Sequence, residues 1–165
     1  IVNTLILTHL GQGDIHIRKD IQRLSEKTVY FKDNSSREYD LILAATGYKL
    51  YYPFIDKKFL DWTGFSPDLY LNIFPRGYDN LFVLGMIEAT GIGWEGRAEQ
   101  GELVAAYIKG LEAKTTAALA FQKLKKGKNP DMTGGYSYLG LERMSYYVHK
   151  DTYRGILQQR IKQLM

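Results

Sequence analysis

Cysteine is absent from the 165-residue sequence, and its absence removes several classes of chemistry. Disulfide bonds, a thiolate nucleophile, cysteine-ligated zinc sites and a Cys-x-x-Cys redox pair are excluded. A chain without cysteine fits a reducing compartment, so we expect a cytoplasmic location. No apolar run is long enough to span a bilayer, and the opening IVNTLILTHL is too short for a signal peptide and has no basic start.

Motifs for metal binding and for hydrolysis are missing as well. The three histidines, His9, His16 and His149, have no partner at metal-ligand spacing, and we interpret them as surface or helix residues. The sequence has neither a G-x-S-x-G motif nor a defensible Ser-His-Asp order. We therefore expect no metal site, and the sequence assigns no catalytic residue.

The composition is that of a soluble globular protein, with 45% hydrophobic and 24% charged residues. The net charge of +4 permits an anionic ligand but does not predict nucleic-acid binding. Lysines cluster only in KLKKGK (123–128), which we interpret as a solvated helix end and loop. The sequence starts with Ile1 rather than Met, which favours a piece from the interior of a longer polypeptide.

The first third of the sequence predicts one helix followed by strands. Apolar spacing favours a helix over residues 1–11, and alternation favours a strand within 14–25. Residues 28–33 (TVYFKD) predict a second strand, and the following DNSS predicts a turn. Residues 38–46 (EYDLILAAT) form a continuous apolar run, which is typical of a strand buried on both faces. Together these segments predict a short antiparallel unit that leads into a buried strand.

The remainder changes from irregular and strand segments to helices. We expect irregular structure over 47–69, because Pro53 and Pro67 interrupt it, and a short buried strand over 80–85. A helix is predicted over 97–113 and a second over 115–127, and the pattern leaves open whether the two are continuous. The tail from residue 141 is predicted to be helical, with a break near Gly155. The apolar face of the first of these helices comprises Leu103, Val104, Tyr107, Ile108 and Leu111.

The stretch GIGWEG (91–96) fits the G-x-G-x-x-G pattern of a dinucleotide-binding loop. That motif requires a strand directly before the first glycine and a second strand after the helix. Here the predicted strand stops at Gly85, no strand follows the helix, and Trp94 is poorly suited to contact a pyrophosphate. We therefore interpret the stretch as a flexible strand-to-helix connection. The helix starting near Glu95 directs its positive end toward whatever lies in front, which suits an electron-rich ligand atom.

Two further patterns leave alternatives open. The acids Glu95, Glu99 and Glu102 share roughly one side of the helix start, where acids usually complement the helix dipole. The aromatic stretches YKLYYPF (48–54) and GGYSYLG (134–140), the latter followed by MSYY (144–147), can stack a planar ligand. Such stretches more often pack a loop or form a subunit contact.

Residues 28–56 (TVYFKDNSSREYDLILAATGYKLYYPFID) closely resemble the last third of flavin-containing monooxygenases and related Baeyer–Villiger enzymes. HLGQGDIHI (9–17) resembles the helix end that precedes this segment in the family. NLFVLGMIEATG (80–91) and EGRAEQGELVAAYIKG (95–110) resemble its final strand, glycine loop and closing helix. The resemblance covers residues 1 to about 113 and is most specific over 40–48.

The resemblance implies an α/β chain that is the C-terminal part of a flavoprotein with two dinucleotide-binding domains, one for FAD and one for NADPH. The family forms a C4a-hydroperoxyflavin and transfers one oxygen atom to a soft nucleophile or a ketone. Residues 1–48 would end the nicotinamide-binding domain with short antiparallel strands. Residues 49–113 would supply the closing strand and helix of the FAD domain, within an incomplete Rossmann-like sheet. Residues 114–165 would form a helical C-terminal extension.

The resemblance also implies the cofactor-binding positions. The segment at 45–48 would be the crossing between the nicotinamide and FAD domains, and the loop from Gly85 would lie beside the isoalloxazine ring. The helix that starts near Glu95 would point at the flavin pyrimidine edge. The candidate cofactor-binding residues are Thr46, Gly47, Tyr48, Gly85, Met86, Gly91, Gly93, Trp94 and Glu95.

Both dinucleotide fingerprints of the family would lie upstream of this chain. We therefore expect the fragment alone to be inactive and to lack bound FAD and NADPH. Its partners would be a small-molecule substrate, the missing N-terminal half, and a second copy through oligomerisation or a domain swap. Disulfide reductases are excluded, because cysteine is absent and Met86 follows Gly85. An amine N-hydroxylase and a non-catalytic α/β interaction module remain as alternatives.

Overall fold

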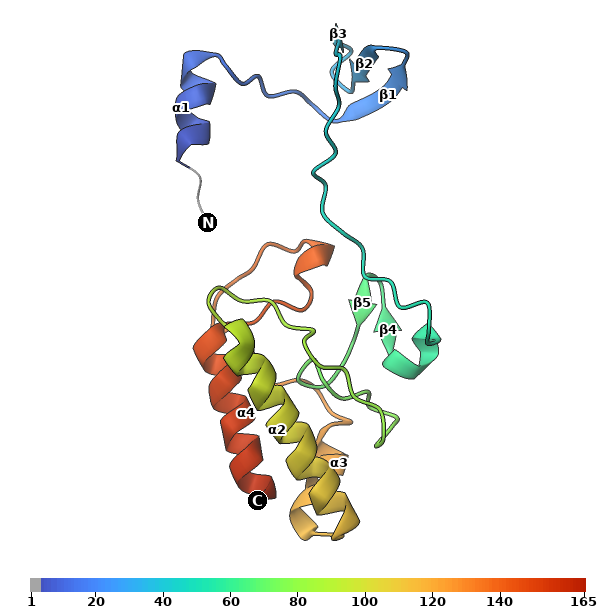
Figure 1. The fold of residues 1–165 in the computed structure, drawn as a ribbon, viewed down its shortest axis with the longest axis vertical. Coiled ribbons are helices and arrows are strands. Elements are labelled where there is room, and N and C mark those ends of the chain that lie inside the picture. The colour runs from blue at the N-terminus through green and yellow to red at the C-terminus, as the bar shows by residue number, and fades with distance from the viewer. Residues whose placement is uncertain (1–3) are drawn as a thin grey trace. The chain divides into compact units, whose positions relative to one another are not determined.

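The computed structural model describes residues 4–165, which form two compact units that divide between Gly47 and Tyr48 (Figure 1). The first unit contains helix α1 (Leu5–Gln12) and a three-stranded antiparallel sheet. Its strands are β1 (Ile21–Ser25), β2 (Thr28–Phe31) and β3 (Ser36–Glu38), in the order β1-β2-β3. The sheet buries one face of its central strand, where Val29 and Phe31 are the buried apolar residues.

The predicted turn between the second and third strands is confirmed, and the side chain of Asp33 holds it. One carboxylate oxygen of Asp33 accepts hydrogen bonds from the Ser35 backbone N–H at 3.0 Å and from the Ser35 hydroxyl at 2.6 Å. Asn34 adopts a left-handed conformation with φ 64°. Asp and Asn tolerate this geometry because their short side chains bond the local backbone.

The predicted strands of the first unit are only partly confirmed. The strand expected within 14–25 is limited to its last five residues, and helix α1 ends at Gln12 rather than Gly11. The buried strand expected over 38–46 is wrong: Glu38 ends β3, and the residues after it have no regular structure. Leu41 and Leu43 are 79% and 84% exposed. A strand buried on both faces needs partner strands and covering layers, and β1–β3 provide neither for this run.

The second unit is a helical layer with irregular connections. It begins with the 3₁₀ helix η1 (Lys57–Leu60) and a short hairpin of β4 (Trp62–Thr63) and β5 (Ser66–Pro67). The main helices are α2 (Gly93–Glu112), α3 (Thr116–Leu124) and α4 (Lys150–Leu164), and the 3₁₀ helix η2 (Glu142–Met144) precedes α4. Helices α2 and α4 pack side by side, and α3 packs against both (Figure 1).

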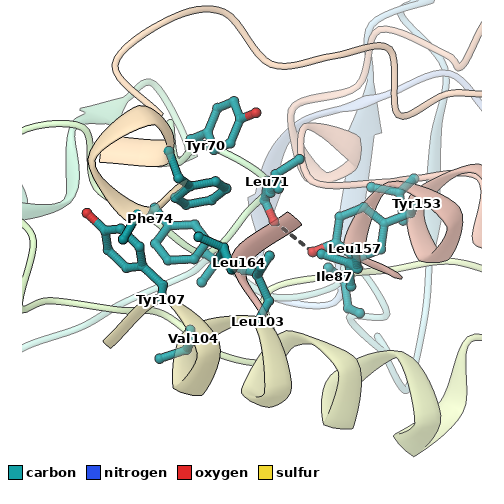
Figure 2. Packing of buried hydrophobic residues seen from close by; sticks show 14 of the residues in the cluster. Tyr70, Leu71, Phe74, Ile87, Leu103, Val104, Tyr107, Tyr153, Leu157 and Leu164 are labelled. Carbon is teal, nitrogen blue, oxygen red and sulfur yellow. Dashed lines mark hydrogen bonds between the residues drawn. The ribbon is translucent and has the colours of Figure 1, made fainter. Parts of the chain in front are cut away.

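An aromatic cluster forms the centre of this unit (Figure 2). The ring of Phe74 lies 5.6 Å from that of Tyr107 on α2 and 5.2 Å from that of Phe121 on α3, both edge-on. The irregular segment that carries Phe74 is held by Asn129, whose side chain accepts from the Leu71 N–H at 2.7 Å and donates to the Leu69 carbonyl at 3.0 Å. A loop with satisfied backbone groups can therefore enter the core.

The predicted helices are present, but several of their boundaries and buried faces differ from those expected from the sequence. The helix expected over 97–113 begins at Gly93, and Ile108 of its predicted apolar face is exposed. The second helix is confirmed, and it is separate from α2, because Lys114 is left-handed and the Thr115 hydroxyl caps the Ala118 N–H at 3.2 Å. The tail is helical only from residue 150, apart from the short η2, and α4 continues through Gly155 without the expected break.

Two further expectations in this unit are wrong. The buried strand expected over 80–85 has no regular structure; Leu84 is exposed, and Val83 makes one backbone hydrogen bond, from its N–H to the Ile73 carbonyl at 2.9 Å. The lysine run at 123–128 is not entirely solvated, because Lys125 is fully buried. Its ammonium group reaches backbone carbonyls of the 75–78 segment, which local sequence could not indicate.

Two glycines of α2 give opposite predictions for substitution by alanine. A Cβ at Gly110 would lie 2.9 Å from the Ala118 Cβ on α3, whereas a Cβ at Gly101 would meet nothing within 4 Å. We expect Gly101→Ala to raise the free energy of unfolding by about 0.5–1 kcal/mol through helix propensity. Gly110→Ala should lower it by about 1–3 kcal/mol by forcing α2 and α3 apart. Urea denaturation of both variants measures this, and equal effects would contradict the packing of α3 on α2.

Candidate functional site

The candidate site is built around the glycine-rich loop that enters helix α2. Gly85, Gly91 and Gly93 all have positive φ angles, of 86°, 74° and 52°, which side chains with a Cβ rarely adopt. Ile92 at the N-cap gives α2 no side-chain cap. The first N–H groups of the helix therefore have no acceptor from the side chain of the N-cap residue.

The third glycine of the GIGWEG pattern has a packing role. A Cβ at Gly96 would lie 2.5 Å from Cγ1 of Ile92, so this position allows the turn to close on a buried isoleucine. Residues 81–84 before the loop do not form a strand. The strand–loop–helix arrangement that cradles a pyrophosphate is thus missing around this loop.

The other predicted residues of this loop differ in exposure. Met86 is buried, whereas Trp94 is 85% exposed and lies beside the Arg97 guanidinium at 5.8 Å. The Glu95 carboxylate forms an ion pair with Arg154, with 2.8 Å between Glu95 Oε1 and Arg154 Nη2. The loop and the start of α2 thus bring together Gly85, Met86, Gly91, Gly93, Trp94 and Glu95 on one continuous stretch.

The remaining predicted residues lie in the segment that follows β3. Thr46 and Gly47 belong to the first unit, are exposed, and have no regular structure; Gly47 has a φ of 84°. Tyr48 begins the second unit and is fully exposed.

Sequence reasoning missed a buried hydrogen-bond chain behind the glycine loop. The Gly85 N–H donates to Gln100 Oε1 at 2.8 Å, and Gln100 Nε2 donates to the Tyr153 hydroxyl at 2.7 Å. Tyr153 in turn donates to the Leu71 carbonyl at 2.7 Å (Figure 2). Burial raises the pKa of Tyr153, so the hydroxyl keeps its proton and remains a donor. This series of hydrogen bonds connects the Gly85 turn to helix α4.

An ion pair between the buried Glu99 and the partly buried Arg154 links α2 to α4. The Arg154 guanidinium donates to both Glu99 oxygens, at 2.7 Å from Nη2 and 2.9 Å from Nε, and Gln158 adds a third donor at 2.8 Å. The hydrogen bonds from Arg154 hold the pKa of Glu99 below its usual value. Glu102 is exposed, so the three acids grouped by sequence do not act alike.

The sequence contains one signal for the hydrogen bonds behind the glycine loop, which is a polar residue on an apolar helical face. Gln100 lies one turn before Leu103 and Val104 and is fully buried with them. A buried polar side chain must find hydrogen-bond partners, and Gln100 finds them at both ends of its amide. The identity of those partners, on Gly85 and Tyr153, depends on tertiary packing.

Residues 4–165 contain neither a candidate membrane span nor a candidate metal cluster. No helix of this part of the chain is long and apolar enough to cross a bilayer. No group of three or more His, Cys, Asp or Glu side chains in the described range is arranged to hold a metal ion.

Comparison of the sequence with known proteins shows which family the chain is similar to. The sequence model of the flavin-binding monooxygenase-like family matches residues 1–151. Dimethylaniline monooxygenase (N-oxide-forming) 2 of Pan troglodytes and flavin-containing monooxygenase 2 of Homo sapiens are each 28% identical over 114 residues, 67% of this chain. Flavin-containing monooxygenase 1 of Mus musculus is 25% identical over 143 residues, 84% of this chain. The matched regions span only 21%, 21% and 27% of these relatives. No solved structure matches the chain significantly.

Proposed function

Because the chain belongs to the flavin-binding monooxygenase-like family, we propose that it is the C-terminal portion of an FAD- and NADPH-dependent monooxygenase. Such an enzyme inserts one oxygen atom from O2 into a soft nucleophile or a ketone. The family match over residues 1–151 is the observation that carries this proposal. The name of the Pan troglodytes relative refers to N-oxide formation, which favours an amine nitrogen as the acceptor.

The geometry at the start of α2 fits one edge of a flavin ring. The uncapped N–H groups of α2 and its positive dipole end would stabilise negative charge on that edge. Arg154 pairs with Glu95 and Glu99, so these two carboxylates do not cancel the positive end of the helix. FAD, when bound and reduced, would supply the reaction with O2.

Other parts of the two cofactors do not fit the described residues. A pyrophosphate cradle needs a strand leading into a glycine loop, and residues 81–84 do not provide one. We therefore propose that the missing N-terminal half supplies both dinucleotide fingerprints. In this assignment residues 1–48 end the nicotinamide domain, 49–113 close the FAD domain and 114–165 form its helical extension. Thr46, Gly47 and Tyr48 would then form the crossing between the two domains.

The exposed apolar run after β3 supports a further part of this proposal. Leu41, Ile42 and Leu43 are exposed and their segment has no strand partner in its unit. We propose that the missing half covers this run in the complete enzyme, and that the isolated chain covers it by oligomerising or exchanging segments. Light scattering of the isolated chain should then show species larger than a monomer.

The complete reading frame provides the test of function. We expect the full-length product to be yellow, with FAD at one per chain and NADPH oxidation that depends on dimethylaniline. The 165-residue chain alone is the matched control and should remain colourless. An N-hydroxylated product from a primary amine would instead indicate an amine N-hydroxylase. A colourless full-length protein that FAD does not reconstitute would overturn the proposal and favour an interaction module.

A further inference from the structure

A cavity of about 520 Å³ lies within the second unit, and most of its lining residues belong to the C-terminal extension. Three tyrosines of the C-terminal extension line it, Tyr136, Tyr138 and Tyr147, and Met144 adds an apolar surface. Its other wall includes Ala89 and Thr90, from the loop between Gly85 and Gly93. We call it the tyrosine cavity. Its volume is within the range of small-molecule sites, roughly 300–1,000 Å³.

Backbone contacts hold the three walls of the tyrosine cavity in place. The Val148 N–H donates to the Glu88 carbonyl at 3.0 Å, which joins the α4 approach to the glycine loop. The His149 N–H donates to the Met132 carbonyl at 2.7 Å, which joins it to the segment that carries Tyr136. That segment approaches closely, because a Cβ at Gly134 would lie 2.7 Å from the His149 ring. The cavity is thus built by segments distant in sequence.

The chemistry of the walls selects the type of molecule that fits. Aromatic faces pack favourably against flat rings, and the Met144 thioether also contacts aromatic rings well. The charged groups on the wall offset each other, because Lys150 and Asp151 approach to 3.8 Å. The hydroxyls of the three tyrosines have no hydrogen-bond partner within the described residues and remain free for a polar substituent. These features favour a neutral, planar ligand.

We propose that the tyrosine cavity binds a neutral planar aromatic molecule. We also propose that this molecule is the one that is oxidised, which rests on the proposed monooxygenase function. Ala89 and Thr90 support this assignment, because they belong to the proposed flavin loop. The assignment gives the aromatic stretches of the extension a ligand-binding role. It also places the oxygen acceptor on the α4 side of that loop.

Ligand-detected NMR on the 165-residue chain, without FAD, tests the cavity directly. The probes are anisole and methoxycyclohexane, which have the same heavy-atom count and differ in the flatness of the ring. We expect saturable binding of anisole at one site and roughly tenfold weaker binding of methoxycyclohexane. Tyr138→Ala and Tyr147→Ala should each weaken anisole binding roughly tenfold. Tyr51→Ala, at an exposed tyrosine outside the cavity, is the matched control and should leave binding unchanged.

A second variant keeps the test decisive if an alanine variant does not fold. Ser137 is an exposed lining residue, so Ser137→Trp should occupy part of the cavity and weaken anisole binding at least about tenfold while the circular dichroism spectrum is retained. Equal affinity for the two probes, absence of saturable binding, or full binding in a folded Ser137→Trp protein would each overturn the proposal. Because no flavin takes part, these results are separate from the FAD stoichiometry that tests the proposed function.

Discussion

Replacing Lys125 with methionine is expected to lower the free energy of unfolding of the second unit by about 3 kcal/mol. The Lys125 ammonium donates to the carbonyls of Pro75 and Tyr78, each at 2.9 Å, and is fully buried. It also lies 3.2 Å from an Asp79 carboxylate oxygen. Methionine preserves the apolar stem but leaves these acceptors without their donor, and an unsatisfied buried acceptor is costly.

The neighbouring lysines of the same run give matched controls. Lys123 and Lys126 are exposed, and their replacement by methionine should change the free energy of unfolding by less than about 0.5 kcal/mol. Urea denaturation followed by circular dichroism measures all three variants. Equal midpoints for Lys125→Met and the two controls would show that the ammonium group does not hold the 75–79 segment.

Arg154→Met should have a comparable or larger effect, about 3–5 kcal/mol, because it leaves the Glu99 carboxylate buried with Gln158 as its remaining donor. The double variant Glu99→Met/Arg154→Met should recover much of the loss, since it removes both charges together. Lys162→Met, on an exposed position of α4, is the control for methionine itself. A double variant as unstable as Arg154→Met would contradict an origin in the unpaired carboxylate.

The same pair predicts how stability depends on pH. Hydrogen bonds from Arg154 lower the pKa of Glu99 in the folded state below its ordinary value of 4.5. A carboxyl whose pKa is lowered by folding stabilises the protein above its unfolded pKa, and this contribution is lost as pH falls through the folded pKa. The difference in midpoint between the native chain and Arg154→Met should therefore shrink from pH 7 to below pH 4.5. A difference that stays constant would argue against the ion pair.

Asp79 should contribute to the acid sensitivity in the same direction. Burial alone would raise the pKa of Asp79, but hydrogen bonds from Gln122, Tyr107 and Lys125 outweigh it and lower the pKa. The Tyr107 hydroxyl donates to this carboxylate at 2.8 Å and the Gln122 amide donates at 2.6 Å. Two separate carboxylates thus anchor α2, one through α4 and one through α3 and the 75–79 segment.

Local signals in the sequence predicted local structure well. The turn at Asp33 and the helix start at Thr115 are set by side chains that bond their own backbone, so three or four residues contain the information. The strands predicted from the apolar runs at 38–46 and 80–85 are wrong, because a strand forms only where another strand pairs with it. After Glu38, which ends β3, neither run pairs with a strand in the described residues.

The candidate site shows the same division. The resemblance and the glycine pattern selected the loop at Gly85–Glu95, and the left-handed glycines and the uncapped helix are there. The buried groups behind the loop were not predicted, since Gln100 and Tyr153 are 53 residues apart and meet only when α4 packs on α2. Lys125 was misassigned for a related reason, because its carbonyl partners come from a segment about 50 residues earlier.

The exposed run after β3 also has a consequence for how the chain folds in a cell. From Leu41 to Tyr48 no residue is charged; Asp40 and Lys49 bracket the stretch. Uncharged apolar stretches with free backbone N–H and C=O groups are templates for intermolecular β-pairing and aggregation. During synthesis this stretch would remain exposed, and available for chaperone binding, until a strand pairs with it. We therefore expect co-expression of a segment that pairs with these residues to raise the soluble fraction of the chain.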